Sequence, residues 1–123
     1  MPVKVLVIDD DDLLLSLMAA AFRREGFETL SAQDGNAGLR AYNAETPALV
    51  VTDIVMPDKE GIATIIELKN RPSPPKVIAI SGGGRIPGGC VLRWATHLGA
   101  DDAMIKPFAM SALVAAGRHL LAQ

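Results

Sequence analysis

Polar side chains capable of metal or phosphate chemistry follow four apolar segments of this chain. In chain order they are Asp9 and Asp10 after Val3–Ile8, Asp53 after Leu49–Val51, Ser81 after Val77–Ile80, and Lys106 after Asp102–Ile105. A short unbroken apolar run is typical of a strand buried on both faces of a parallel sheet. Because parallel strands end at one edge, these side chains are expected to converge where open α/β sheets bind ligands.

Three carboxylates, one hydroxyl and one ammonium group at one place favour phosphoryl chemistry. Clustered carboxylates raise one another's pKa unless a cation neutralises them. Hard oxygen ligands favour Mg²⁺, which keeps open positions for water and phosphate. A lysine supplies a point charge for a phosphoryl oxygen, and a serine hydroxyl can donate a hydrogen bond to another. A carboxylate can itself accept the phosphoryl group, so the residues predict a Mg²⁺-dependent phosphoryl-transfer site.

Each of these residues also has a purely structural interpretation. Asp53 could cap the turn after its strand, and the acidic run Asp9–Asp12 could be a solvated helix start. His97 and His119 fall on expected helices away from the strand ends, so they are interpreted as surface or structural residues. The single cysteine, Cys90, excludes an internal disulfide and has no catalytic partner pattern. Convergence of the whole set favours the functional interpretation for the strand-end residues.

Strand and helix signals alternate five times, which predicts one α/β domain over residues 1–123. The expected strands are Val3–Ile8, Glu28–Ala32, Leu49–Val51, Val77–Ile80 and Asp102–Ile105. The expected helices are one capped by Asp11 or Asp12 and ended by Gly26, then Asn36–Ala44, Gly61–Lys69, Val91–Leu98, and a last one from Met110 to Leu121. Inward stripes are predicted at Leu14, Leu17, Met18, Ala21 and Phe22, and at Ile62, Ile65, Ile66 and Lys69. The segment Gly82–Gly89 is expected to be a loop.

Composition limits the classes of binding partner and the cellular compartment that can be expected for this protein. The net charge of −2 offers no general attraction for nucleic acid or an acidic membrane. No apolar run approaches the roughly 20 residues of a membrane span. The N-terminus also lacks the basic region, apolar segment and cleavage site that follow one another in a signal peptide. A cytoplasmic protein without direct nucleic-acid or membrane contact is therefore expected.

The chain resembles the receiver domain of two-component response regulators. The matching segments are Val5–Asp10, Asp53 with Met56-Pro57 and Gly61, Ser81, and Lys106-Pro107-Phe108, in the family's order along essentially the whole chain. The resemblance implies a flavodoxin-like fold, a doubly wound five-stranded parallel sheet of order 2-1-3-4-5 with five helices. The sequence of this chain departs from the family pattern at Ala103, where the family often has an aromatic switch residue. A switch that works by rotation of an aromatic side chain is therefore not expected.

The resemblance also implies roles for individual residues. Asp53 is the phosphoacceptor, and Ser81 and Lys106 bind the phosphoryl group. Mg²⁺ is ligated by Asp10 and Asp53, by Asp9 directly or through water, and by the backbone carbonyl of Val55. A cis peptide bond is expected before Pro107.

The implied donor is a phosphohistidine on a sensor histidine kinase or a histidine phosphotransfer protein. The chain would catalyse only its own phosphorylation and hydrolysis, and would not act as an enzyme on other substrates. Since it ends at Gln123, just after the last helix, a stand-alone receiver that signals through an unknown output protein is expected.

Two other functions remain open from the sequence. A Mg²⁺-dependent phosphatase of the haloacid dehalogenase type also uses a strand-end aspartate, and Asp9-x-Asp11 fits its paired carboxylates. That alternative leaves the Asp53 segment without a role and the chain without room for a cap domain. A pseudo-receiver with a purely structural pocket is disfavoured by the complete set of polar residues.

Overall fold

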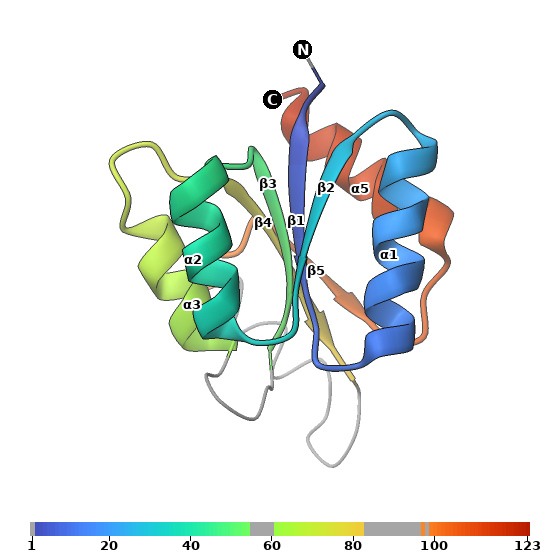
Figure 1. The fold of residues 1–123 in the computed structure, drawn as a ribbon, viewed down its shortest axis with the longest axis horizontal. Helices are drawn as coiled ribbons and strands as arrows, with labels where there is room; N and C mark the ends of the chain where they lie inside the picture. Colours follow the sequence, from blue (N-terminus) through green and yellow to red (C-terminus); the bar gives the residue numbers. More distant parts are fainter. Residues whose placement is uncertain (1, 55–60, 83–96, 98) are drawn as a thin grey trace.

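Five parallel strands form one central sheet (Figure 1). The computed structural model describes residues 2–54, 61–82, 97 and 99–123. The strands are β1 (Lys4–Ile8), β2 (Glu28–Ala32), β3 (Leu49–Asp53), β4 (Lys76–Ser81) and β5 (Asp102–Ile105). Their order is β2-β1-β3-β4-β5, and every neighbouring pair is parallel. The predicted flavodoxin-like sheet is confirmed, and it places β3 at its centre.

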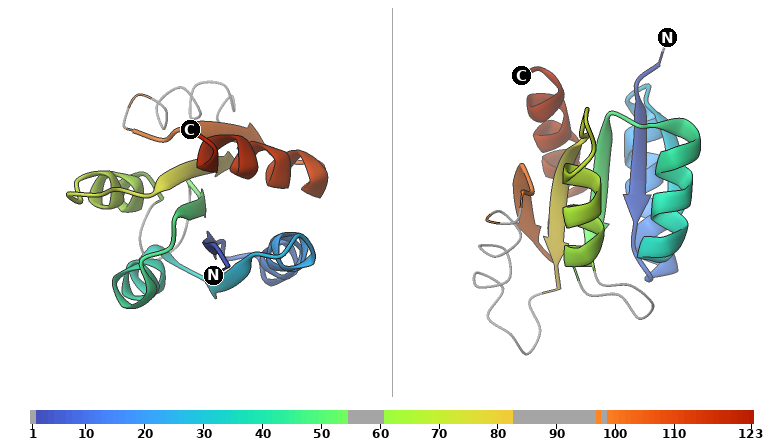
Figure 2. Two further views of the ribbon diagram at one scale, coloured as in Figure 1. Left: turned by 90° about the horizontal axis from the view of Figure 1, so that it is seen from above. Right: turned by 90° about the vertical axis from the view of Figure 1, so that its left-hand side faces the viewer.

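Helices cover both faces of this sheet, as the views along and across the strands show (Figure 2). The described helices are α1 (Asp12–Arg24), α2 (Gly35–Glu45), α3 (Gly61–Lys69) and α5 (Met110–Leu121). The expected helix Val91–Leu98 lies outside the described residues apart from His97, which is helical and exposed. The expected loop Gly82–Gly89 also lies outside them from residue 83 onward. None of the helices described is long and apolar enough to cross a membrane.

The core has two halves because successive residues of a strand face opposite sides of the sheet. Val5 and Val7 of β1 pack with Phe22 in the half under α1 and α5. Leu6 and Ile8 pack in the other half, under α2 and α3. All four strand residues are fully buried, which explains why β1 has an unbroken apolar sequence. The two halves fix β1 between its layers and so fix the position of Asp9 at its end.

Side-chain caps set where the first two helices begin. Asp11 is the N-cap of α1, and its Oδ1 accepts hydrogen bonds from the backbone N–H groups of Leu13 and Leu14. Asp34 caps α2 in the same way, accepting from the N–H of Ala37 at 2.8 Å. An aspartate at this position satisfies otherwise unpaired N–H groups and interacts favourably with the helix dipole. Of the two residues that the sequence offered as the cap, Asp11 is the correct one.

Two strands, β3 and β4, are longer than the sequence predicted, and the inward faces of two helices differ from the prediction. β3 continues through Thr52 to Asp53, and β4 continues to Ser81, so both polar residues are the last residues of their strands. Leu17 was predicted to face inward but is 48% exposed, whereas its neighbour Met18 is fully buried. Ile66 was likewise predicted inward and is 39% exposed, because α3 faces the sheet with Thr64, Ile65 and Leu68.

Candidate functional site

The end of β1 holds Asp9 in a fixed and completely buried position. Its N–H donates to the carbonyl of Ala32 at 3.1 Å, which extends the β1–β2 ladder by one residue. Its Oδ1 accepts a hydrogen bond from the N–H of Asp11 at 2.9 Å, at the N-cap of α1. The side chain of Asp9 is 0% exposed. The strand and the helix start therefore aim this carboxylate along the carboxyl edge of the sheet.

Asp53 ends the neighbouring central strand. It pairs in register with Ile80 of β4, and the residue is 6% exposed. The next residue, Ile54, donates its N–H to the carbonyl of Ile80 at 2.9 Å, so the backbone remains attached to β4 beyond the strand end. Asp53 is thus a nearly buried carboxylate on a rigid element, beside Asp9 on the adjacent strand.

Lys106 directly follows β5, which lies on the other side of β4, and its side chain reaches both carboxylates. Its Nζ lies 3.1 Å from Oδ2 of Asp53 and 3.2 Å from Oδ2 of Asp9. Its backbone N–H donates to the carbonyl of Ser81 at 2.8 Å, which continues the β4–β5 ladder. The peptide bond to Pro107 is cis, as predicted. Ser81 itself is buried at the end of β4, where it pairs with Ile105.

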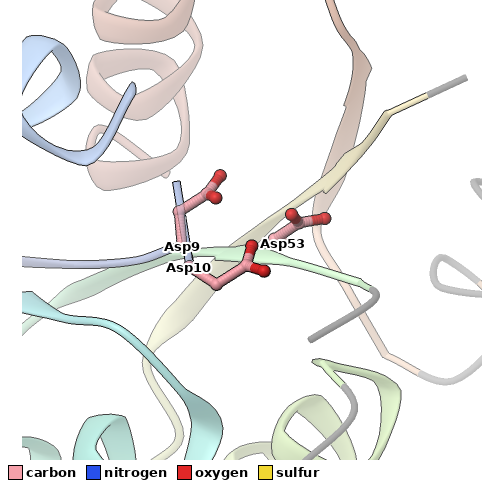
Figure 3. A group of neighbouring side chains, drawn as sticks. All are labelled: Asp9, Asp10 and Asp53. Carbon is pink, nitrogen blue, oxygen red and sulfur yellow. The ribbon is translucent and has the colours of Figure 1, made fainter. Parts of the chain in front are cut away.

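The three predicted acidic residues gather into one cluster (Figure 3). Asp9, Asp10 and Asp53 each offer an oxygen, and these oxygens lie within 4.8 Å of one another. Asp10 is exposed, whereas the other two are buried, so the cluster has one side open to solvent. Among the described residues, Oδ2 of Asp9 accepts no hydrogen bond, although it is fully buried and Lys106 is close. Hard oxygen donors with a buried, incompletely satisfied carboxylate fit a Mg²⁺ ion.

The electrostatics of the site reflect crowding of like charges. Burial raises the pKa of the Asp9 carboxyl, the nearby Asp53 charge raises it further, and the Asp11 N–H and Lys106 only partly oppose this rise. Burial alone would lower the pKa of Lys106, but the charges of Asp53 and Asp9 outweigh it and raise this pKa. The lysine therefore remains protonated, and without a metal it is a cation shared by two carboxylates.

The other residues singled out from the sequence lie away from this cluster or outside the described residues. Val55 lies outside the described residues, as do Met56, Pro57 and Cys90. Ala103 is half-buried in β5, in register with Ala79 of β4. His119 is exposed on α5, where it contacts Gln123, which agrees with a surface role.

The structure adds one contact near the site that the sequence did not indicate. The side-chain amide of Gln33 donates a hydrogen bond to Asp12. This contact joins the start of α1 to the loop after β2, and it gives Asp12 a structural partner separate from the acidic cluster. The two residues are too far apart in the sequence for any local pattern to link them, so their spacing could not predict this hydrogen bond.

Comparison with known proteins agrees with this geometry. The sequence model of the response regulator receiver domain matches residues 5–118. The transcriptional regulatory protein PrrA of Mycobacterium tuberculosis is 32% identical over 118 residues, which cover 96% of this chain and 49% of PrrA. The transcriptional regulatory protein CpxR of Klebsiella pneumoniae is 36% identical over 118 residues, which cover 96% of this chain and 49% of CpxR. The chain thus spans about half the length of these curated relatives.

A solved structure shows the same fold. The crystal structure of the receiver domain of NtrX from Brucella abortus superposes with a TM-score of 0.89 at 31% identity, covering 97% of this chain and 98% of that one. The family match extends over most of the chain and includes the strand ends that carry Asp9, Asp53, Ser81 and Lys106. The chain therefore belongs to the response regulator receiver domain family.

Proposed function

We propose that this receiver takes a phosphoryl group from a phosphohistidine onto Asp53. The observation that carries the proposal is the position of Asp53, nearly buried at the end of the central strand and 3.1 Å from Lys106 Nζ. In the reaction a carboxylate oxygen of Asp53 would attack phosphorus as the bond from phosphorus to the histidine nitrogen breaks. The electron pair of that bond stays with the imidazole, and the product on this chain is an aspartyl phosphate.

Six groups of the chain would support this transfer. Asp9, Asp10, Asp53 and the backbone carbonyl of Val55 would hold Mg²⁺, which when bound neutralises charge on the phosphoryl oxygens. Lys106 would exchange part of its contact with Asp53 for a phosphoryl oxygen, and the Ser81 hydroxyl would donate to another. Because phosphoryl transfer depends mainly on positioning and charge, these residues suffice without a separate base.

The donor is proposed to be a sensor histidine kinase or a histidine phosphotransfer protein. Leu13 and Leu17 of α1 are 71% and 48% exposed, and they follow the acidic run directly in sequence. Their spacing puts them on one face of the helix, whose first turn follows the acidic run. Burying two exposed leucines against a protein donor would favour binding, and a small phosphodonor lacks that contribution.

The output is proposed to be a change in binding to another protein. Residues 1–123 would act as one cytoplasmic receiver domain whose phosphorylation changes that affinity. PrrA and CpxR are named transcriptional regulatory proteins. The chain carries a formal net charge of −2, so direct contact with nucleic acid is not proposed for it.

The phosphatase alternative is not favoured. It requires the carboxylate of Asp11 to act beside Asp9, but that carboxylate caps α1 through the N–H groups of Leu13 and Leu14. The match to the receiver domain family also favours a receiver over a phosphatase. We therefore propose that the chain catalyses only its own phosphorylation and dephosphorylation.

Intact-mass analysis after incubation with acetyl phosphate and Mg²⁺ tests the proposal. The wild-type protein should gain one phosphoryl group, and Asp53→Asn should gain none. Asp12→Asn is the matched control, because Asp12 lies next to the site but bonds to Gln33; it should be labelled like the wild type. Undiminished labelling of Asp53→Asn would refute the assignment, and steady turnover of p-nitrophenyl phosphate would favour the phosphatase.

A further inference from the structure

Gly61, the first residue of α3, lies directly against the backbone that carries Asp53. Its N–H donates to the carbonyl of Ile54 at 2.7 Å. A β-carbon at Gly61 would overlap the carbonyl oxygen of Asp53, and it would come within 2.7 Å of Cα of Ile54 and 2.8 Å of the carbonyl carbon of Asp53. Every atom in this contact belongs to the backbone, so no flexible side chain can turn away to make room.

The two sides of this contact are both held by packing. On the strand side, Asp53 pairs with Ile80, and Ile54 donates its N–H to the carbonyl of Ile80 at 2.9 Å. On the helix side, Ile65 and Leu68 are fully buried against the sheet. A methyl group at residue 61 must therefore move the end of β3, the first turn of α3, or both. Either movement changes the direction in which the Asp53 side chain leaves the sheet.

We infer that Gly61 is a positioning residue, whose missing side chain lets α3 start at the backbone of Asp53 and sets that carboxylate within reach of Asp9, Asp10 and Lys106. The inference rests on the proposed function, since it assigns Gly61 to the Mg²⁺-binding and phosphoacceptor site. The oxygens of the cluster lie within 4.8 Å of one another, and Lys106 is at 3.1 Å from Asp53. A displacement of about an ångström at such a site is enough to lower rates on the order of a hundredfold.

Gly117 provides a matched control in the same chain. It is a buried glycine in α5, and a β-carbon there would come within 2.8 Å of Cδ2 of Leu49 and 3.2 Å of Cε1 of Phe22. These are side-chain atoms of the core under α1 and α5, and Leu49 starts the strand that Asp53 ends. Gly117→Ala therefore adds the same methyl group to a buried helix face while leaving the backbone of Asp53 untouched.

The test compares Gly61→Ala, Gly117→Ala and the wild type in two measurements. The first is Mg²⁺ binding by calorimetric titration, which needs no phosphodonor. The second is the rate of labelling by acetyl phosphate, corrected for the folded fraction measured by circular dichroism. Gly61→Ala should bind Mg²⁺ about tenfold or more weakly and react more slowly by a similar factor, whereas Gly117→Ala should stay within about twofold of the wild type.

Each result has a distinct meaning. A wild-type protein that neither binds Mg²⁺ nor is labelled overturns the proposed function and the inference with it. A normal wild type with Gly61→Ala unchanged overturns the inference alone. If Gly61→Ala is poorly folded, the measurements are repeated in trimethylamine N-oxide, which favours the compact state. Failure to fold even there, with Gly117→Ala folded, would overturn the inference by showing that Gly61 serves the fold and not the site.

Discussion

Asp9 and Lys106 form an ion pair of 3.2 Å in which the carboxylate is completely buried while the lysine side chain is 24% exposed. The pair is unequal, because the lysine can reach water and the aspartate cannot. The lysine is also shared with Asp53, at 3.1 Å. One cation therefore faces two carboxylates, and the metal-free site is left with excess negative charge. This imbalance suits the binding of a divalent cation and makes the metal-free protein less stable than its packing permits.

Replacing Asp9 by Asn should stabilise the metal-free protein at neutral pH. Because burial raises the pKa of Asp9, the native state keeps a proton that the unfolded state releases, and stability falls as pH rises through this window. The gain of Asp9→Asn over the wild type should be largest at neutral pH and should vanish in acid, below both the ordinary and the raised pKa. Thermal unfolding of both proteins in EDTA, at a series of pH values, measures this difference in stability. An Asp9→Asn protein that is less stable at neutral pH would contradict this account of the site.

Removing the shared cation should have the opposite effect. Lys106→Met leaves two carboxylates without their lysine and should lower the free energy of unfolding of the metal-free protein by about 1–3 kcal/mol, since the site is only partly buried. Mg²⁺ should restore more stability to this variant than it adds to the wild type, because it supplies the missing positive charge.

Lys69→Met is the control for this substitution. Lys69 forms an ion pair of 2.9 Å with Asp101, and both side chains are partly buried. Its loss should also destabilise the protein, but its response to Mg²⁺ should match that of the wild type. Urea unfolding with and without Mg²⁺ gives the free energy of unfolding of each variant and its change on adding Mg²⁺. Equal Mg²⁺ responses in the two lysine variants would show that Lys106 does not share its site with the metal.

Asp10 and Asp12 should differ sharply in their effect on metal binding. Asp10 belongs to the acidic cluster, whereas Asp12 accepts a hydrogen bond from Gln33. Asp10→Ala should abolish measurable Mg²⁺ binding, because a site with few protein oxygens depends strongly on each of them. Asp12→Ala should leave affinity nearly intact while loosening the start of α1. Titration with Mg²⁺ alone compares them, and similar losses in both would mean that the acidic run acts only through its total charge.

The positions of the site residues were predictable because strand ends are marked strongly in the sequence. Unbroken apolar runs end at Asp9 and Ser81, and parallel strands bring such ends to one edge. The inward faces of helices were harder to predict. Leu13–Leu17 contains four leucines, so several helical stripes fit its pattern, and only packing against β1 and α5 decides that Leu15 is buried and Leu17 is not.

Two contacts between distant segments, those of Gly61 and Gln33, could not be predicted from periodicity or strand ends. The glycine at residue 61 suggested a turn or a helix start, but its overlap with the Asp53 carbonyl depends on how closely α3 approaches β3. The link between Gln33 and Asp12 likewise depends on the relative placement of two loops. Such features follow from tertiary packing, which composition and periodicity do not encode.

The last prediction concerns how phosphorylation is reported beyond the site. Ala103 offers no ring that could change rotamer, so the Ser81 hydroxyl is the group best placed to respond to a phosphoryl oxygen. Ser81 also accepts the N–H of Lys106 through its carbonyl at 2.8 Å, so a movement of Ser81 is shared with the end of β5. A hydrogen bond gained in one state can bias a two-state segment by a few kcal/mol at most.

Trp94, the single tryptophan of the chain, lies in the segment between Ser81 and Lys106 and should therefore change its fluorescence on phosphorylation. Ser81→Ala removes only the hydroxyl and keeps the carbonyl that binds Lys106, so the fluorescence change should disappear even while Asp53 is still phosphorylated. Ser31→Ala, at an exposed position of β2, should respond like the wild type. An undiminished response in Ser81→Ala would show that the coupling does not run through this hydroxyl. A silent Trp94 in a protein whose partner still distinguishes the two states would indicate that the segment carrying Trp94 is not the output surface, and α5 would become the better candidate.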